Sequence, residues 1–320
     1  MKETAMSTRH RIEELDYLKC ILIVLMISFH LVYISELYPY AKQVVYTFHM
    51  PIFLVLSGFL MNVEKPNRLY LRTLLFYFIP YVIMESGYIV MASMLPIREH
   101  IDNLTISVFL NKLLLHPLGP YWYLHTLVIC GFTYFCIFRL FPCKNISRYI
   151  LLGILYAMLA YYGEVISLTM SFYFLAGIII RHSGIPILQI FRPSWLALAA
   201  FVLLVMYPAN LNSSAPGGIL IAYLFVSFAL AVYPYISFVL RRLMLFIGRN
   251  TLSLLLFSPI FTILCKSLVP ILSFDTSGMI FLVVSLIICI VGSLLITFFM
   301  DGLRLSPFFF GRQKALVSYT

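Results

Sequence analysis

Few ionisable side chains interrupt the apolar runs of this sequence, and those that do can move a proton. They are His30, His49, Glu85 and His125. An ionisable group at membrane depth is expensive, so such groups usually mark function. A histidine beside a carboxylate can act as an oriented general base. A rise of about 1.5 Å per residue puts His30, His49 and Glu85 about 18–21 Å inside their apolar runs, so we expect them in one layer.

Lys19 precedes His30 in the first apolar run. Their spacing is three helical turns plus about 20°, which places both side chains on one face, about 16 Å apart along the axis. That face offers a cation near one end and a neutral base deep inside, which suits a long ligand with an anionic head and a reactive tip. Each histidine alone also fits a structural role, hydrogen-bonded to a neighbouring helix. Pro51 predicts a kink that either tilts His49 toward a cavity or serves packing alone.

Ten apolar runs must position these residues. They cover 18–34, 44–61, 71–93, 122–141, 146–163, 165–180, 194–208, 217–239, 251–270 and 279–300. With 62% hydrophobic and 11% charged residues, the chain is too apolar for a soluble core. A bilayer core of about 30 Å requires about 17–25 apolar residues as helix, and the runs lack the alternation of membrane β-strands. The sequence therefore predicts an all-α, polytopic transmembrane helix bundle of about ten spans.

Basic residues fall mainly in alternate gaps between these runs. Of the 22 Lys and Arg residues, 18 lie on one side, and the other four are Lys42, Arg98, Lys112 and Lys266. The positive-inside rule assigns the 18 to the cytoplasm, together with both termini. We expect one integral-membrane domain over 1–320, with a cytoplasmic lead-in (1–17) and a cytoplasmic tail (301–320). The net charge of +10 fits lipid head-group contact or a pocket for a polyanion, and no basic run suggests nucleic acid.

Several short motifs recur in a fixed order along the chain. They are Asp16-Tyr17-Leu18-Lys19-Cys20-Ile21 with His30, Phe48-His49-Met50-Pro51 with Ser57-Gly58-Phe59, Arg68 with Arg72, Tyr121-Trp122-Tyr123-Leu124, and Gly248-Arg249-Asn250-Thr251-Leu252. The set resembles the membrane acyltransferase-3 family, which includes O-antigen, capsule and enterobacterial-common-antigen O-acetyltransferases. The family hallmark is a basic residue, ten residues and then a histidine, which Lys19 and His30 match. The chain departs from many relatives at Ser258, where they carry a histidine.

The resemblance implies a multi-pass acyltransferase of the bacterial inner membrane that transfers groups other than aminoacyl. The donor would be cytoplasmic acetyl-CoA or another acyl-CoA, without a metal, and the acceptor a hydroxyl of a surface polysaccharide or lipid-linked glycan. We assign the general base to His30, with Glu85 or His49 orienting it or relaying the proton. The remaining expected roles are coenzyme binding by Lys19, Arg68 and Arg72, and acceptor binding by Trp122, Tyr121 and His125. Membrane lipids are further expected partners, and the oligomeric state stays open, a homodimer being one option.

Two other functions compete with this interpretation. Ten spans also suit a transporter or flippase of a small solute or glycan precursor, although the chain has neither an internal repeat nor paired broken helices in its two halves. The missing family histidine leaves open an inactive scaffold for polysaccharide assembly. Within the enzyme hypothesis, an acyl-enzyme on Ser57 or another hydroxyl is the alternative to direct transfer, but no G-x-S-x-G motif supports it.

Overall fold

The computed structural model describes residues 11–94 and 100–317, and these residues are helical with no strand. The first half contains α1 (Glu13–His30), α2 (Val32–Leu37), α3 (Pro39–Leu60), α4 (Asn67–Met94), α5 (Ile106–Leu114), the 3₁₀ turn η1 (Gly119–Tyr121), α6 (Trp122–Leu140) and α7 (Asn145–Tyr161). The second half contains α8 (Leu168–His182), α9 (Ile187–Ile190), α10 (Leu196–Val205), η2 (Pro208–Asn210), α11 (Pro216–Val232), η3 (Tyr233–Tyr235), α12 (Phe238–Arg249), α13 (Thr251–Leu264), η4 (Cys265–Leu268), α14 (Val269–Leu272), α15 (Met279–Gly302) and α16 (Ser306–Phe310).

Each of the ten predicted spans overlaps at least one helix. Six helical stretches within the described residues are long and apolar enough to cross a membrane: Pro39–Leu60, Asn67–Met94, Gly119–Leu140, Pro216–Tyr235, Thr251–Leu272 and Met279–Gly302. The helices α7, α8 and α10 are apolar but shorter, and α1 carries several charged residues in its first two turns. The structure thus supports a helical, multi-pass membrane protein, while ten crossings and cytoplasmic termini remain predictions.

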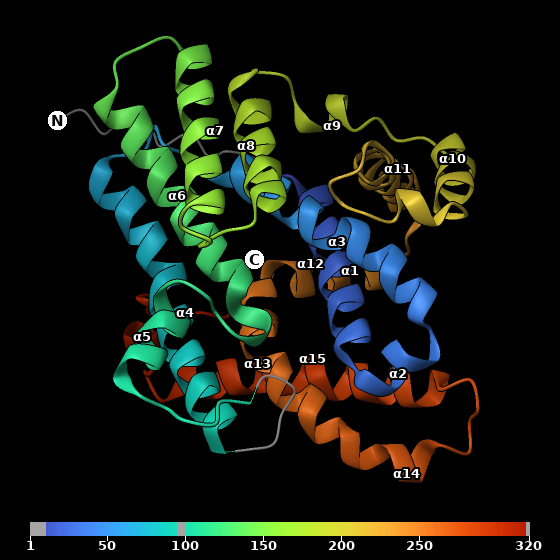
Figure 1. Cartoon of the computed structure of the whole chain (residues 1–320). Coiled ribbons are helices and arrows are strands. Elements are labelled where there is room, and N and C mark those ends of the chain that lie inside the picture. The colour runs from blue at the N-terminus through green and yellow to red at the C-terminus, as the bar shows by residue number, and fades with distance from the viewer. Residues whose placement is uncertain (1–10, 95–99, 318–320) are drawn as a thin grey trace, which may run out of the picture.

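The two faces of α15 show how the bundle meets lipid. An exposed ridge of apolar side chains recurs every four residues, at Val283, Ile287, Val291 and Leu295. The opposite face buries small side chains at the same spacing, namely Ser285, Cys289, Ser293 and Thr297. Small residues let helices approach closely in a membrane, and α13 packs beside α15 (Figure 1). The period of 3.6 residues therefore separates a lipid-facing ridge from a helix-packing face.

An extensive, close helix contact joins α3 to α8 and depends on two glycines. A Cβ atom built on Gly58 would collide with the backbone of Phe174, and one built on Gly177 would collide with the backbone of Val55. The absence of these side chains lets the two backbones touch. The pair α3 and α8 thereby fixes the position of the last turns of α3, which contribute to the site described below.

The helix α1 lies at the centre of the bundle (Figure 1). It packs against α3, α11, α12, α13 and α15. Its helical geometry breaks at Leu31, whose φ of −71° and ψ of 107° are extended. As a result α1 ends at His30, four residues before the end of the predicted span, and the short helix α2 continues the chain.

Candidate active site

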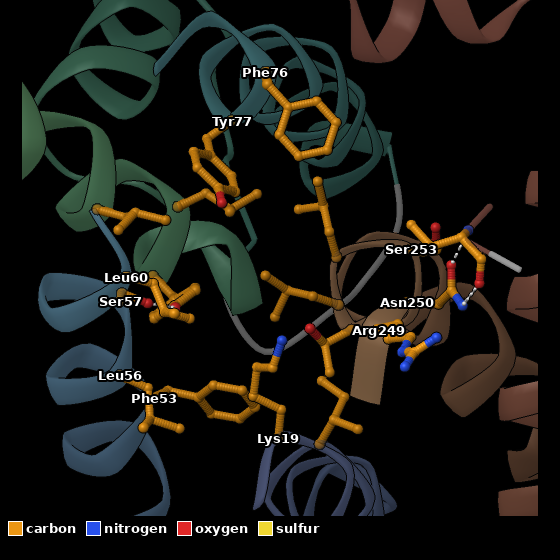
Figure 2. Close-up of a pocket in the computed structure, with 18 of the residues that line it drawn as sticks. Lys19, Phe53, Leu56, Ser57, Leu60, Phe76, Tyr77, Arg249, Asn250 and Ser253 are labelled. Atoms are coloured by element: carbon orange, nitrogen blue, oxygen red, sulfur yellow. Dashed lines mark hydrogen bonds between the residues drawn. The ribbon is translucent and has the colours of Figure 1, made fainter. Parts of the chain in front are cut away.

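A cavity of about 270 Å³ lies among α1, α3, α4, α6 and α13, and we call it the central cavity. Figure 2 shows Lys19 reaching into it from α1 and Tyr77 from the opposite wall, on α4. Ser57 of α3 lies on a third side, and its hydroxyl shares a hydrogen bond of 2.7 Å with the hydroxyl of Tyr123. Apolar side chains such as Phe53 complete much of the wall. The cavity thus combines an apolar lining with a few polar groups, as is typical of small-molecule sites.

One buried carboxylate organises the charged mouth of this cavity. Asp16 is only 2% exposed. It pairs with Arg11, with Lys19 at 2.7 Å and with Arg249 at 3.4 Å. Burial raises the pKa of the Asp16 carboxyl, but the hydrogen bond from Arg11 and the charge of Lys19 outweigh burial and hold this pKa below its usual value. Three cations around one carboxylate leave the mouth positively charged.

A larger cleft of about 1190 Å³ adjoins the mouth, and we call it the basic cleft. Arg11 and Lys19 line both spaces, so the two adjoin at these residues. Three further arginines line the cleft, Arg139, Arg148 and Arg181. Arg139 donates to the carbonyl oxygens of Val63 and Lys65 at 2.9 and 2.7 Å, and Arg181 donates to that of Phe59 at 2.9 Å. These bonds hold the guanidinium groups in place, and a positively charged cleft of this kind can bind a ligand with several phosphates.

The predicted face of α1 leads from the mouth toward His30. Lys19, Ile23 and Met26 line the central cavity at successive turns, and His30 follows one turn beyond Met26. Met26 and Met50 are the innermost lining residues of their helices, so the cavity ends below His30. His30 is exposed beyond that end.

His30 and His49 lie on either side of Tyr46. The ring of Tyr46 is 6.2 Å from that of His30 and 5.1 Å from that of His49, between centroids. The Nδ1 atom of His30 lies 2.7 Å from the carbonyl oxygen of Met26, and that of His49 lies 2.8 Å from the carbonyl oxygen of Val45. A carbonyl can only accept, so Nδ1 carries the proton in each ring, and Nε2 of the neutral imidazole holds the lone pair.

Glu85 occupies a different environment. It is fully buried on α4, and its Oε1 accepts a hydrogen bond of 2.6 Å from the backbone N–H of Leu118. One turn earlier, the hydroxyl of Tyr81 donates to the carbonyl oxygen of Leu113 at 2.5 Å. These bonds attach the last turn of α5 and the segment that follows it to α4. These contacts attach Glu85 to the chain around Leu118, and the two histidines lie on either side of Tyr46. A role for Glu85 in orienting the base or relaying the proton stays a prediction.

The three expected acceptor residues separate into two places. Trp122 and His125 line a pocket of about 770 Å³ on the predicted outer side, together with His116 and Lys112. Tyr121 instead turns inward, is 2% exposed, and donates from its hydroxyl to the carbonyl oxygen of Leu256 at 3.0 Å. Adjacent residues at the start of a helix point in different directions, so the structure brings only two of the three together.

The expected coenzyme residues also separate. Lys19 lies at the junction of the central cavity and the basic cleft. Arg72 lies in a smaller side pocket with Lys65, and Arg68 is exposed on the first turn of α4. Sequence reasoning overlooked Arg11, although it lies five residues from Asp16. The motif around Arg249 signalled importance but could not show that this arginine reaches Asp16 from α12.

Comparison with known proteins identifies the protein family to which the chain belongs. It is a multi-pass helical membrane protein whose cavity opens at a cationic mouth, and a family profile described as an acyltransferase domain matches residues 12–298. The chain therefore belongs to the acyltransferase-3 family and is a membrane acyltransferase. No curated protein and no solved structure matches it significantly.

Proposed function

We propose that the protein transfers an acyl group, acetyl above all, from cytoplasmic acyl-CoA to a hydroxyl of a surface polysaccharide or lipid-linked glycan in the bacterial inner membrane. The nucleotide part of the donor occupies the basic cleft, and its thioester arm passes Lys19 into the central cavity. The acceptor approaches His30 from the opposite, outer side. The roles of the donor, the acceptor and His30 all belong to this proposal.

The observation that carries the proposal is the contact of 2.7 Å between Nδ1 of His30 and the carbonyl oxygen of Met26. Because Nδ1 donates to the Met26 carbonyl oxygen, Nε2 is left as an acceptor. This ring lies at the end of the helix face that lines the central cavity. A proton acceptor one helical turn beyond the inner end of this cavity can serve hydroxyl attack on a thioester once the donor arm reaches it.

The proposed reaction balances without a metal or an acyl-enzyme. The acceptor oxygen attacks the thioester carbonyl carbon while Nε2 of His30 removes the hydroxyl proton. The C–S bond breaks, and the leaving thiolate of coenzyme A takes up the proton that His30 holds. His49 lies across Tyr46 from His30, and its part in orienting the base or relaying the proton belongs to the same proposal.

His30→Ala tests this proposal. We expect glycan-dependent thioester consumption by the purified protein to fall by about 10²–10⁴-fold, the usual contribution of a general base. Binding of coenzyme A should persist, because His30 lies beyond the lining of the central cavity. Unchanged acylation in this variant would remove His30 as the base. Net uptake of a radiolabelled solute into proteoliposomes, without any thioester consumption, would favour the transporter instead.

A further inference from the structure

The segment after α15 folds back onto the cavity, although it lies beyond the residues matched by the family profile, 12–298. It comprises α16 and residues 311–317, which we call the C-terminal strap. Ala315 and Val317 of the strap line the central cavity. The strap therefore forms part of the wall of a site whose other walls belong to the family domain.

Polar side chains hold the strap in place, and Asp301 and Asn250 make most of the contacts. The Asp301 carboxylate accepts hydrogen bonds from the backbone N–H groups of Ala315 and Leu316 at 2.8 and 3.0 Å. Asn250 makes a reciprocal pair with Val317, accepting from its N–H at 2.8 Å and donating to its carbonyl oxygen at 3.1 Å. Because Asn250 follows Arg249 directly, the strap is attached next to the charged mouth.

This attachment directs Arg312 toward two other cations. Gly311 turns the chain with a φ of 65°, and the Arg312 guanidinium then lies over the Phe76 ring, 3.6 Å from its centroid. Arg312 and Arg72 line a pocket of about 290 Å³ with Lys65, and we call it the side pocket. Arg312 also lines the central cavity, so the side pocket adjoins the donor site.

The charge balance of the side pocket differs from that of the mouth. At the mouth, Asp16 compensates the neighbouring cations. The residues that line the side pocket, all within the described part of the chain, include Lys65, Arg72 and Arg312 but no Asp or Glu. Like charges held together cost free energy unless an anion joins them. The stacked guanidinium of Arg312 keeps its N–H edge available for the forked contacts that phosphate oxygens accept.

We propose that Lys65, Arg72 and Arg312 form a second anion site, which binds a phosphate group of the acyl donor. The inference rests on the proposed function, since it assumes a coenzyme A donor in the central cavity. It adds the C-terminal strap to the donor site and assigns Arg312 as a binding residue. A phosphate from a lipid head group is the competing source of the same chemistry.

The test compares coenzyme A with pantetheine, which lacks phosphates, by calorimetry on the purified protein in nanodiscs of zwitterionic lipid. Arg312→Ala should weaken coenzyme A binding by about tenfold or more, the effect of losing a charge-assisted hydrogen bond, and leave pantetheine binding unchanged. Lys314→Ala is the matched control, because it removes one positive charge from an exposed position of the same strap. It should leave both affinities unchanged.

Further outcomes decide the source of the phosphate and guard against misfolding. Arg312→Lys keeps the charge and should retain part of the affinity, which separates phosphate binding from a general collapse of the strap. Equal coenzyme A affinity in wild type and Arg312→Ala would overturn the inference while leaving the proposed function intact. A loss of coenzyme A affinity in Arg312→Ala that appears only in nanodiscs containing anionic lipid would also overturn the inference. If the wild type binds no coenzyme A at all, the proposed function itself fails.

Discussion

Replacing Asp16 by asparagine should lower stability and raise donor affinity at the same time. The carboxylate is 2% exposed and pairs with Arg11, Lys19 and Arg249. Asparagine keeps the shape but removes the negative charge that these three cations share. Removing one partner of a buried ion pair costs about 3–5 kcal/mol. The Arg11 side chain is 49% exposed and therefore contributes little, so we expect a loss of about 2–3 kcal/mol here.

The same substitution makes the mouth more positive and frees the ammonium group of Lys19 for a ligand. One additional unscreened charge near 4 Å is worth about 1 kcal/mol in water, or about fivefold in affinity. We therefore expect the variant to be less stable but to bind the donor more tightly. Thermal unfolding should show a Tm lower by about 5 °C, and calorimetry with coenzyme A should show a Kd about fivefold smaller. Glu36→Gln, which removes one negative charge from an exposed position, is the control and should change neither.

The pH dependence follows from the lowered pKa of Asp16. A carboxyl whose pKa is lower in the folded state than its unfolded value of about 3.9 stabilises the protein above that value. This contribution is lost as the pH falls through the folded pKa. The stability difference between wild type and Asp16→Asn should thus stay constant between about pH 5 and 8 and close below about pH 4. An Asp16→Asn protein as stable as wild type, with unchanged donor affinity, would refute the ion-pair account.

Two further predictions concern packing and donor size. Gly58→Ala should destabilise the protein by about 1–3 kcal/mol in thermal unfolding, because its Cβ would meet the Phe174 backbone. Gly87→Ala, where a Cβ meets nothing within 4 Å, should be neutral or stabilising; equal effects would refute the contact. Met26→Ala, beside Met50 at the inner end of the central cavity, should raise the kcat/KM for butyryl-CoA relative to acetyl-CoA about tenfold. An unchanged ratio would place the acyl group elsewhere.

The helix-internal features of the site could be predicted from the sequence because one helix has a fixed period. Lys19 and Met26 line one cavity, with His30 one turn further, as a spacing of 3.6 residues per turn requires. The apolar runs likewise mark the helices, since lipid demands continuous apolar segments. Lateral neighbours could not be predicted in this way. The position of Glu85 along its apolar run predicted the same depth as the histidines. In the structure its side chain contacts the segment before α6 instead.

The strap shows the same limit at longer range. From the sequence, residues 301–320 are expected only to form a cytoplasmic tail after the last apolar run. Their position depends on Asp301 and Asn250 supplying partners to backbone N–H groups of 315–317. An asparagine 67 residues away from its backbone partner leaves no periodic signal. Burial of backbone donors requires partners, but the sequence does not say where they lie.

The inner end of the central cavity links the fold to the proposed chemistry. Met26 and Met50 are 4% and 8% exposed, and they close the cavity one turn below His30. A helix rises about 5.4 Å per turn, so the thioester carbon can approach the imidazole only if these side chains move aside. Methionine is unbranched and flexible, and it repacks at little cost. In the proposed reaction, the donor arm therefore displaces the two methionines as it fills the space they leave. The bound donor then fills the cavity, so that no open path leads from the cytoplasm past His30.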